Sequence, residues 1–250
     1  MWNDNDFKGR VAVVTGGSDG LGFDFCRGLI EAGCTVYFCG RSVERGRHAE
    51  EKLGERARFV ATDVCDAAQI QDLAREVGRL AGRVDYLVNN VANDDRIAFD
   101  TLTEEDCDMM WRTNLRPAIL VTKAFLDLLR AGAGKAIVNI GTTNYMLGLS
   151  PFTTYNATKS GLVGFTRSLA HEIGPEGIRA NMVCPGWVMT GKQLEKHVTE
   201  ADKRELIEVQ ALKFLLEPEH ITPAVMFLLS SGAAAITGQI LVVDAGKVMY

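Results

Sequence analysis

Short runs of β-branched and apolar residues alternate with longer amphipathic stretches along almost the whole chain. The apolar runs are nearly continuous, which is typical of parallel strands that are covered on both faces. They predict strands at Val11–Thr15, Thr35–Cys39, Arg58–Ala61, Tyr86–Asn89, Ala136–Ile140, Arg179–Val183 and Ile240–Val243. The helical periodicity between them predicts helices at Leu21–Ala32, Val43–Leu53, Ala67–Leu80, Glu104–Arg130, Tyr155–Ile173 and Pro218–Leu229.

This alternation predicts an α/β fold, because parallel strands need crossover connections that return on the faces of the sheet. We expect a single Rossmann-like, doubly wound parallel sheet of about seven strands with helices on both faces. No linker or low-complexity stretch interrupts residues 1–250, which indicates one domain.

The segment 188–213 departs from the rhythm, because it is charged and contains no strand pattern. Ligands of such sheets bind beyond the carboxyl ends of the strands, so this insertion is a candidate lid over a substrate. A solvated pair of surface helices explains the same pattern equally well.

Composition excludes several classes of protein. The net charge of -5 argues against a nucleic-acid partner. No apolar run approaches the ~20 residues that a membrane span needs. The six cysteines form no Cys-x-x-Cys pair and the four histidines no His-x-x-x-His pair, so no metal site is expected. Free thiols are typical of a reducing, cytoplasmic location.

A glycine-rich turn, Thr15-Gly16-Gly17-Ser18-Asp19-Gly20-Leu21-Gly22, joins the first predicted strand to a helix. Glycines permit positive φ and let a phosphate approach the backbone, and the helix N-terminus adds unpaired N–H groups. The strand–turn–helix context predicts that this turn binds a dinucleotide, through Gly16, Ser18, Asp19, Gly20, Leu21 and Gly22.

The spacing Thr-Gly-x-x-x-Gly-x-Gly resembles that of the short-chain dehydrogenase/reductase family. The resemblance extends from about Lys8 to Gly246 and includes Asp63-Val64, Asn89-Asn90, Pro185-Gly186 with Thr190, and Val243-Asp244-Ala245-Gly246. At Val91-Ala92 the chain departs from the Ala-Gly that follows the family's Asn-Asn pair. The resemblance implies that the cofactor also contacts Asp63, Val64, Asn90, Pro185, Gly186, Val188 and Thr190.

Tyr155 and Lys159 lie four residues apart in a predicted helix, so they share one helix face. A phenol has a pKa near 10, and a nearby ammonium group favours the phenolate and lowers that pKa. The pair could therefore exchange a proton with an alcohol or a carbonyl. The resemblance implies that Tyr155 and Lys159 are catalytic and that Lys159 also binds the nicotinamide ribose.

The family pairs this tyrosine with a serine after the fifth strand, and here we assign Thr142 to that role. Thr143 is the alternative if the register differs by one residue. Asn114 matches the family's fourth polar residue, whose backbone the resemblance implies in a water chain from Lys159; a helix-interior asparagine bonded to a local carbonyl is the other interpretation.

The end of the second strand indicates the cofactor. Cys39-Gly40-Arg41-Ser42 lacks the acidic residue that binds the ribose 2′-OH of NAD. Arg41 and Ser42 can bind a 2′-phosphate, which favours NADP(H) over NAD(H), whereas the charge of Asp19 opposes a phosphate.

These observations favour an NADP(H)-dependent oxidoreductase that acts on a ketone or secondary alcohol, with no metal. A non-redox lyase or isomerase and a dinucleotide-sensing regulator are the alternatives on the same fold. The loop residues predicted to line the substrate pocket are mostly apolar: Asn93, Asp94, Tyr145, Met146, Leu147, Phe152 and Trp187. The resemblance implies a homodimer or homotetramer, and a monomer remains an alternative.

Overall fold

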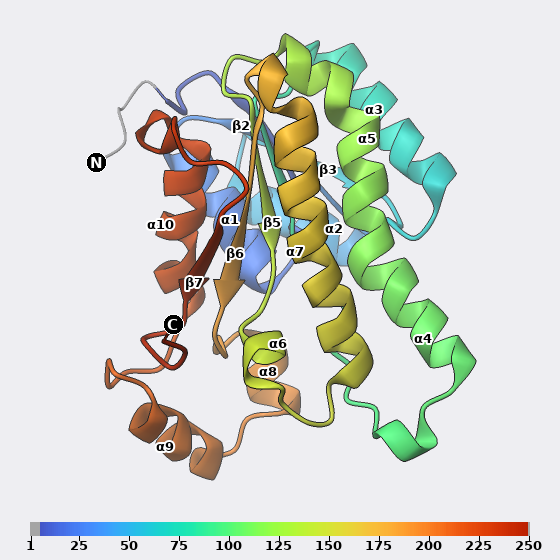
Figure 1. The fold of residues 1–250 in the computed structure, drawn as a ribbon. Helices are drawn as coiled ribbons and strands as arrows, with labels where there is room; N and C mark the ends of the chain where they lie inside the picture. The colour runs from blue at the N-terminus through green and yellow to red at the C-terminus, as the bar shows by residue number, and fades with distance from the viewer. Residues whose placement is uncertain (1–5, 250) are drawn as a thin grey trace.

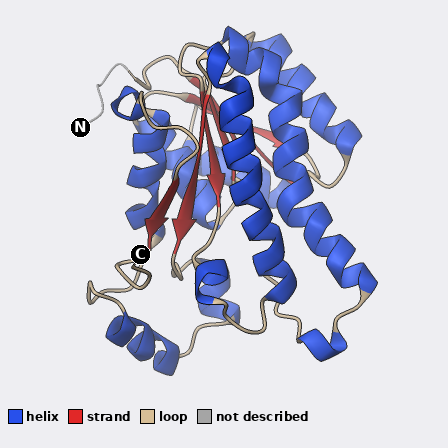
Figure 2. Ribbon diagram, viewed as in Figure 1, coloured by secondary structure: helices blue, strands red, loops and turns tan. Residues whose placement is uncertain are grey.

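One parallel sheet with helices on both faces forms the molecule in the computed structural model, which describes residues 6–249 (Figures 1 and 2). The strand order is β3-β2-β1-β4-β5-β6-β7, and every pairing is parallel. The strands are β1 (Val11–Thr15), β2 (Thr35–Gly40), β3 (Ala57–Ala61), β4 (Tyr86–Asn89), β5 (Ala136–Ile140), β6 (Arg179–Pro185) and β7 (Ile240–Val243). The predicted doubly wound sheet is confirmed.

Two layers of helices cover the sheet. Helices α1, α2 and α10 contribute to the hydrophobic cluster on one face, and α3, α5 and α7 to the cluster on the other (Figure 1). The helices are α1 (Gly20–Glu31), α2 (Val43–Leu53), α3 (Ala67–Ala81), α4 (Glu104–Met110), α5 (Arg116–Ala131), α6 (Asn144–Leu147), α7 (Thr153–Ile173), α8 (Gly191–Lys196), α9 (Glu200–Val209) and α10 (Pro218–Leu229).

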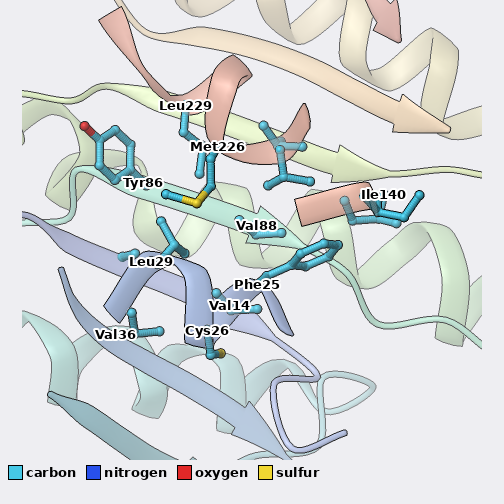
Figure 3. Packing of buried hydrophobic residues seen from close by; sticks show 14 of the residues in the cluster. Val14, Phe25, Cys26, Leu29, Val36, Tyr86, Val88, Ile140, Met226 and Leu229 are labelled. Atoms are coloured by element: carbon cyan, nitrogen blue, oxygen red, sulfur yellow. The ribbon is translucent and has the colours of Figure 1, made fainter. Parts of the chain in front are cut away.

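Alternation along β1 divides the core between the two layers. Val14 packs in the cluster that includes Phe25 and Leu29 of α1 and Met226 of α10 (Figure 3). Its neighbour Val13 is buried in the opposite cluster. Successive side chains of a strand point to opposite faces, so a strand that is apolar at every position is buried on both.

The predicted helix Glu104–Arg130 is interrupted, and that prediction was wrong in the middle. Residues Trp111–Leu115 form a π-helical turn between α4 and α5, in which the Arg116 N–H donates to the carbonyl of Trp111. Pro117 follows at the start of α5. Proline has no N–H to donate to the carbonyl four residues before it, so the regular helical bonding fails here. The turn contains Asn114.

Helices α6, α8 and α9 lie beyond the carboxyl ends of the strands (Figure 1). Helices α8 and α9 occupy the segment 188–213, and residue Val188 makes only an isolated parallel bridge to Leu216. Of the helices within residues 6–249, none combines the length and the apolar character that crossing a membrane requires.

Asp85 connects neighbouring segments at the opposite end of the sheet, just before β4. Its side chain is fully buried and accepts hydrogen bonds from the backbone N–H groups of Val11 (2.9 Å), Ala133 (2.8 Å) and Gly134 (3.0 Å). Burial alone raises the pKa of a carboxyl group, but these three bonds and the Arg10 guanidinium outweigh it and lower the pKa of Asp85.

We expect Asp85→Ala to lower the free energy of unfolding by about 3–5 kcal/mol, because it leaves buried N–H groups without acceptors. Asp85→Asn should be intermediate, since its amide group faces N–H donors. Because the pKa of Asp85 is lower in the folded protein, its ionisation stabilises the fold above the unfolded-state pKa of about 3.9. This stabilisation is lost as the pH falls through the folded-state pKa. Urea unfolding of all three proteins at pH 7 and pH 3.5 measures this; equal stability of wild type and Asp85→Ala at pH 7 would contradict it.

Candidate active site

The turn between β1 and α1 requires glycines, through positive φ values at two of them and close packing at others. Gly16 and Gly20 have φ values of +70° and +54°. A Cβ on Gly22 would lie 2.1 Å from the carbonyl oxygen of Gly16. Directly after β4, the side-chain amide nitrogen of Asn90 donates to the carbonyl oxygens of Thr15 (3.0 Å) and Gly16 (3.3 Å), which fixes the turn.

A cavity of about 520 Å³ adjoins this turn, at the carboxyl ends of β1 to β4. Its walls come from four loops that are distant in the sequence. Seven residues predicted to bind the cofactor line it: Gly16, Ser18, Asp19, Arg41, Ser42, Asp63 and Val64. This is the point where the strand order reverses, the usual ligand site of an open α/β sheet.

The residues present fit a dinucleotide. The Ser18 hydroxyl is buried and has no hydrogen-bond partner among residues 6–249. A Cβ on Gly40 would come within 2.8 Å of its oxygen. Buried hydroxyls normally have partners, so this one suits a ligand oxygen. Asp19 caps α1 by accepting a hydrogen bond from the N–H of Gly20 (2.7 Å), which accounts for an acidic residue in the turn.

Two arginines flank the cavity at the end of β2. Ser42 caps α2 by accepting a hydrogen bond from the N–H of Arg45 (3.3 Å). Arg41 and Arg45 are exposed side chains that both line the cavity, one turn apart. The sequence analysis missed Arg45, although its place in the first turn of the helix after β2 was a usable signal.

A second cavity, of about 380 Å³, lies over the carboxyl ends of β5 and β6. Seven further residues that the sequence predicted to be catalytic or to bind the cofactor line this second cavity: Leu21, Thr142, Tyr155, Pro185, Gly186, Val188 and Thr190. Gly20, Gly22, Asn90, Asn114 and Lys159 do not line either of these two cavities. Gly186 packs closely, since a Cβ there would lie 2.8 Å from the Cβ of Asp244.

Thr142 and Tyr155 meet in this second cavity. Thr142 follows β5 and lines the same cavity as Tyr155, where its hydroxyl lowers the pKa of the phenol. Its Oγ1 also accepts a hydrogen bond from the N–H of Asn144 (3.2 Å). The adjacent Thr143 lines the same cavity, but its hydroxyl points to the carbonyl oxygen of Pro185 (3.4 Å). Thr142 is therefore the threonine that the structure places against Tyr155.

Lys159 lies one helical turn from Tyr155 and is only 2 % exposed. Its Nζ donates a hydrogen bond to the carbonyl oxygen of Ile140 (2.7 Å) and lies 5.9 Å from the centre of the Tyr155 ring. Burial lowers the pKa of Lys159 to about 8.

The predicted lowering of the Tyr155 pKa is wrong for this structure. Burial of the phenol raises its pKa, and the Asp94 carboxylate raises it further, while the nearby Thr142 hydroxyl lowers it. The buried ammonium group of Lys159 is directed to Ile140 and does not reverse the effect of burial. Tyr155 is therefore a neutral phenol, the form that can donate a proton.

Asn114 connects two walls of the site through its side chain. Its Oδ1 accepts a hydrogen bond from the N–H of Asn93 (2.6 Å), and its Nδ2 donates to the carbonyl oxygen of Asn93 (2.8 Å). A further contact joins Nδ2 to Thr158 Oγ1 (3.3 Å) in α7. The π-helical turn thus holds the loop after β4 against the helix that carries Tyr155.

The lining of the second cavity is more charged than the sequence analysis predicted. Asp94, Phe152 and Trp187 line it as expected, whereas Tyr145, Met146 and Leu147 do not. Charged side chains that sequence reasoning missed complete the wall: Arg96, Asp202 and Lys247. They come from three separate loops and helices, so no local pattern brings them together. Within residues 6–249, no cluster of His, Cys, Asp and Glu could hold a metal ion.

Comparisons with known proteins agree with this arrangement. The family model described as enoyl-(acyl carrier protein) reductase matches residues 16–247. The chain is 31% identical to a probable galactose dehydrogenase of Rhizobium meliloti, with 96% of each chain covered. It is 34% identical to a D-xylose 1-dehydrogenase of Caulobacter vibrioides, with 96% of each covered. With a 3-oxoacyl-(acyl carrier protein) reductase of Vibrio harveyi it shares 32% identity over 98% of this chain and 99% of the relative.

Two solved structures are similar over nearly the whole chain. A putative short-chain alcohol dehydrogenase from Sinorhizobium meliloti has a TM-score of 0.90 at 32% identity, with 96% of each chain covered. An NADPH-bound short-chain oxidoreductase from Pseudomonas aeruginosa, described as containing an atypical catalytic center, has a TM-score of 0.90 at 30% identity, covering 96% of this chain and 97% of its own.

The chain belongs to the short-chain dehydrogenase/reductase family. It is an NAD(P)-dependent oxidoreductase that acts on an alcohol or ketone group. Membership disfavours the non-redox and sensing alternatives.

The lowered pKa of Lys159 predicts a pH-dependent stability. Between pH 8 and 10.5 the unfolded lysine binds a proton that the folded one has lost, so stability rises with pH by at most about 3 kcal/mol. Lys159→Met removes this dependence. Urea unfolding at pH 7.5 and pH 9.5 should show wild type gaining stability relative to Lys159→Met at the higher pH. A difference between the two proteins that does not change with pH would refute the lowered pKa.

Proposed function

We propose that this protein is an NADP(H)-dependent oxidoreductase that interconverts a ketone and a secondary alcohol, with Tyr155 as the proton donor and acceptor. The observation that carries the proposal is the meeting of Thr142 and a neutral Tyr155 in one cavity. The cavity beside the glycine-rich turn supports a dinucleotide as the partner of this reaction.

In the direction of carbonyl reduction, the Tyr155 hydroxyl donates its proton to the substrate oxygen, and the Thr142 hydroxyl donates a hydrogen bond that orients that oxygen. When bound, the nicotinamide supplies the hydride. Lys159 would hold the nicotinamide ribose, and its pKa of about 8 would let it exchange protons near neutral pH. Asn114 is a positioning residue, and the water chain from its backbone remains a prediction.

The two cavities also suggest where the other parts of the cofactor bind and what the segment 188–213 does. The turn residues Gly16, Ser18, Gly20, Leu21 and Gly22 would hold the phosphates, and Asp63 and Val64 would hold the adenine side. Residues 188–213 act as a lid, because Gln193 and Asp202 of α8 and α9 line the catalytic cavity. We further propose a homodimer or homotetramer, supported by Trp111 being 44% exposed beside α5, and a cytoplasmic location, supported by the six free cysteines.

Substitutions at the paired hydroxyls test the catalytic roles. We expect Tyr155→Phe to lose nearly all turnover while it binds NADPH about as tightly as wild type, because the ring still packs but carries no proton. Thr142→Ala should lower kcat/KM by a factor that corresponds to about 2.7–4 kcal/mol, the effect of removing one oriented donor, and Thr142→Ser should retain activity.

Oxidation of NADPH, followed by absorbance with a panel of ketones, measures turnover, and fluorescence titration measures binding. Thr143→Ala is the matched control, since its hydroxyl points to Pro185. Substantial turnover by folded Tyr155→Phe would disprove the role of Tyr155. A dead Thr143→Ala beside an active Thr142→Ala would move the role to Thr143.

Cofactor preference depends on the balance between Arg41 and Asp19. A charge-assisted hydrogen bond to a 2′-phosphate contributes about 1.5–3 kcal/mol. Arg41→Ala should therefore weaken the binding of NADPH about ten- to hundredfold and leave the binding of NADH nearly unchanged. Arg45→Ala should act in the same direction. Asp19→Asn keeps a capping oxygen for α1 and removes the charge, so it should strengthen NADPH.

Parallel titrations of NADPH and NADH against these variants measure the preference. Equal weakening of both cofactors by Arg41→Ala would show that Arg41 is structural. Tighter binding of NADH than NADPH by wild type would show that the Asp19 charge dominates.

A further inference from the structure

Arg96, an exposed residue in the wall of the catalytic cavity, lies over two aromatic rings. Its guanidinium carbon lies 5.4 Å from the centre of the Phe152 ring and 5.7 Å from that of Trp187. All three residues line the cavity that contains Thr142 and Tyr155. Contact with ring faces orients a planar guanidinium without using its N–H donors.

The rings that hold Arg96 are themselves fixed to the site. Phe152 packs on Tyr155, with ring centres 5.8 Å apart. The indole N–H of Trp187 donates to Gln193 Oε1 (2.9 Å), and Gln193 Nε2 donates to Asp94 Oδ2 (2.6 Å). The position of Arg96 is therefore set relative to the proton donor.

The charges around Arg96 leave its donors available to a ligand. Asp94 is neutralised by an ion pair with Lys192. Arg96 makes no ion pair or hydrogen bond with another described residue, and Asp202 influences it only as a nearby charge. The Oδ2 of Asp202 accepts hydrogen bonds from the backbone N–H and the hydroxyl of Thr199, at the N-terminus of α9.

The lining contains two cations, Arg96 and Lys247, and two anions, Asp94 and Asp202. Lys192, which lies outside the lining, neutralises Asp94, so one positive charge remains around the cavity. A single positive charge suits a monoanion better than a dianion such as a phosphate monoester. The planar edge of a guanidinium matches the two oxygens of a carboxylate.

We propose that Arg96 binds a carboxylate of the substrate, so that the reaction interconverts an oxo acid and a hydroxy acid. This inference rests on the proposed function and adds the substrate class. It also assigns the roles of Phe152 and Trp187, which orient the arginine, and of Gln193, which positions Trp187.

The test compares ketones that differ only in the acid group. Levulinate and para-acetylbenzoate are each paired with their methyl esters, and kcat/KM is measured for wild type, Arg96→Gln, Arg96→Lys and Arg204→Gln. Arg204 is exposed on α9 and does not line the cavity, so Arg204→Gln removes one positive charge at a site away from the substrate.

We expect wild type and Arg204→Gln to prefer at least one acid over its ester. Arg96→Gln should reduce the acid-to-ester ratio of kcat/KM about ten- to hundredfold, the range for a bond between charged groups. Arg96→Lys should retain part of the preference, since it keeps the charge but loses the planar fork.

A binding measurement separates this inference from the proposed reaction. Calorimetry with para-acetylbenzoate uses NADPH-loaded Tyr155→Phe, with and without Arg96→Gln, and needs no turnover. Weaker binding in the double variant supports the inference even if no ketone is reduced, a result that would count against the proposed function. Ester reduction with no preference for either acid, or equal binding with and without Arg96, would overturn the carboxylate site and leave the proposed function standing.

Discussion

The hydrogen bond from Lys159 to the carbonyl oxygen of Ile140 is the constraint on which the site depends. It fixes α7, which carries Tyr155, against the end of β5, which Thr142 follows by two residues. Burying an ammonium group is unfavourable unless it is hydrogen-bonded, so this contact stabilises the buried position of Lys159, while burial itself lowers the pKa of the lysine. The phenol above it is kept neutral by the same burial.

Much of the fold could be predicted from the sequence because its signals are local. A strand buried on both faces is apolar at every position, and the seven strands lie within one or two residues of their predicted ends. The interruption before α5 was missed because the periodicity of residues 104–130 continues through it. Only the backbone shows that Pro117, which lacks an N–H, follows a π-helical turn.

The residues of the site that could be predicted from the sequence are likewise those that belong to local motifs. Motifs with fixed spacing, such as the glycine-rich turn and the Tyr155–Lys159 pair, predicted residues that the structure brings to one edge of the sheet. Arg96 and Lys247 escaped notice because their places in the cavity depend on how separate loops pack. The direction of the Tyr155 pKa was misjudged because spacing on a helix says nothing about desolvation, which here is the largest influence.

In the proposed reaction, a proton from Tyr155 and a hydride from the nicotinamide reach the same carbonyl group. To follow the hydride, wild type and Tyr155→Phe are incubated with a ketone panel and a reduced cofactor that carries deuterium at both C4 positions, and the products are analysed by mass spectrometry and NMR. We expect one deuterium on the carbinol carbon with wild type and almost no product with Tyr155→Phe. Product without deuterium, or equal amounts of deuterated alcohol from both proteins, would contradict it.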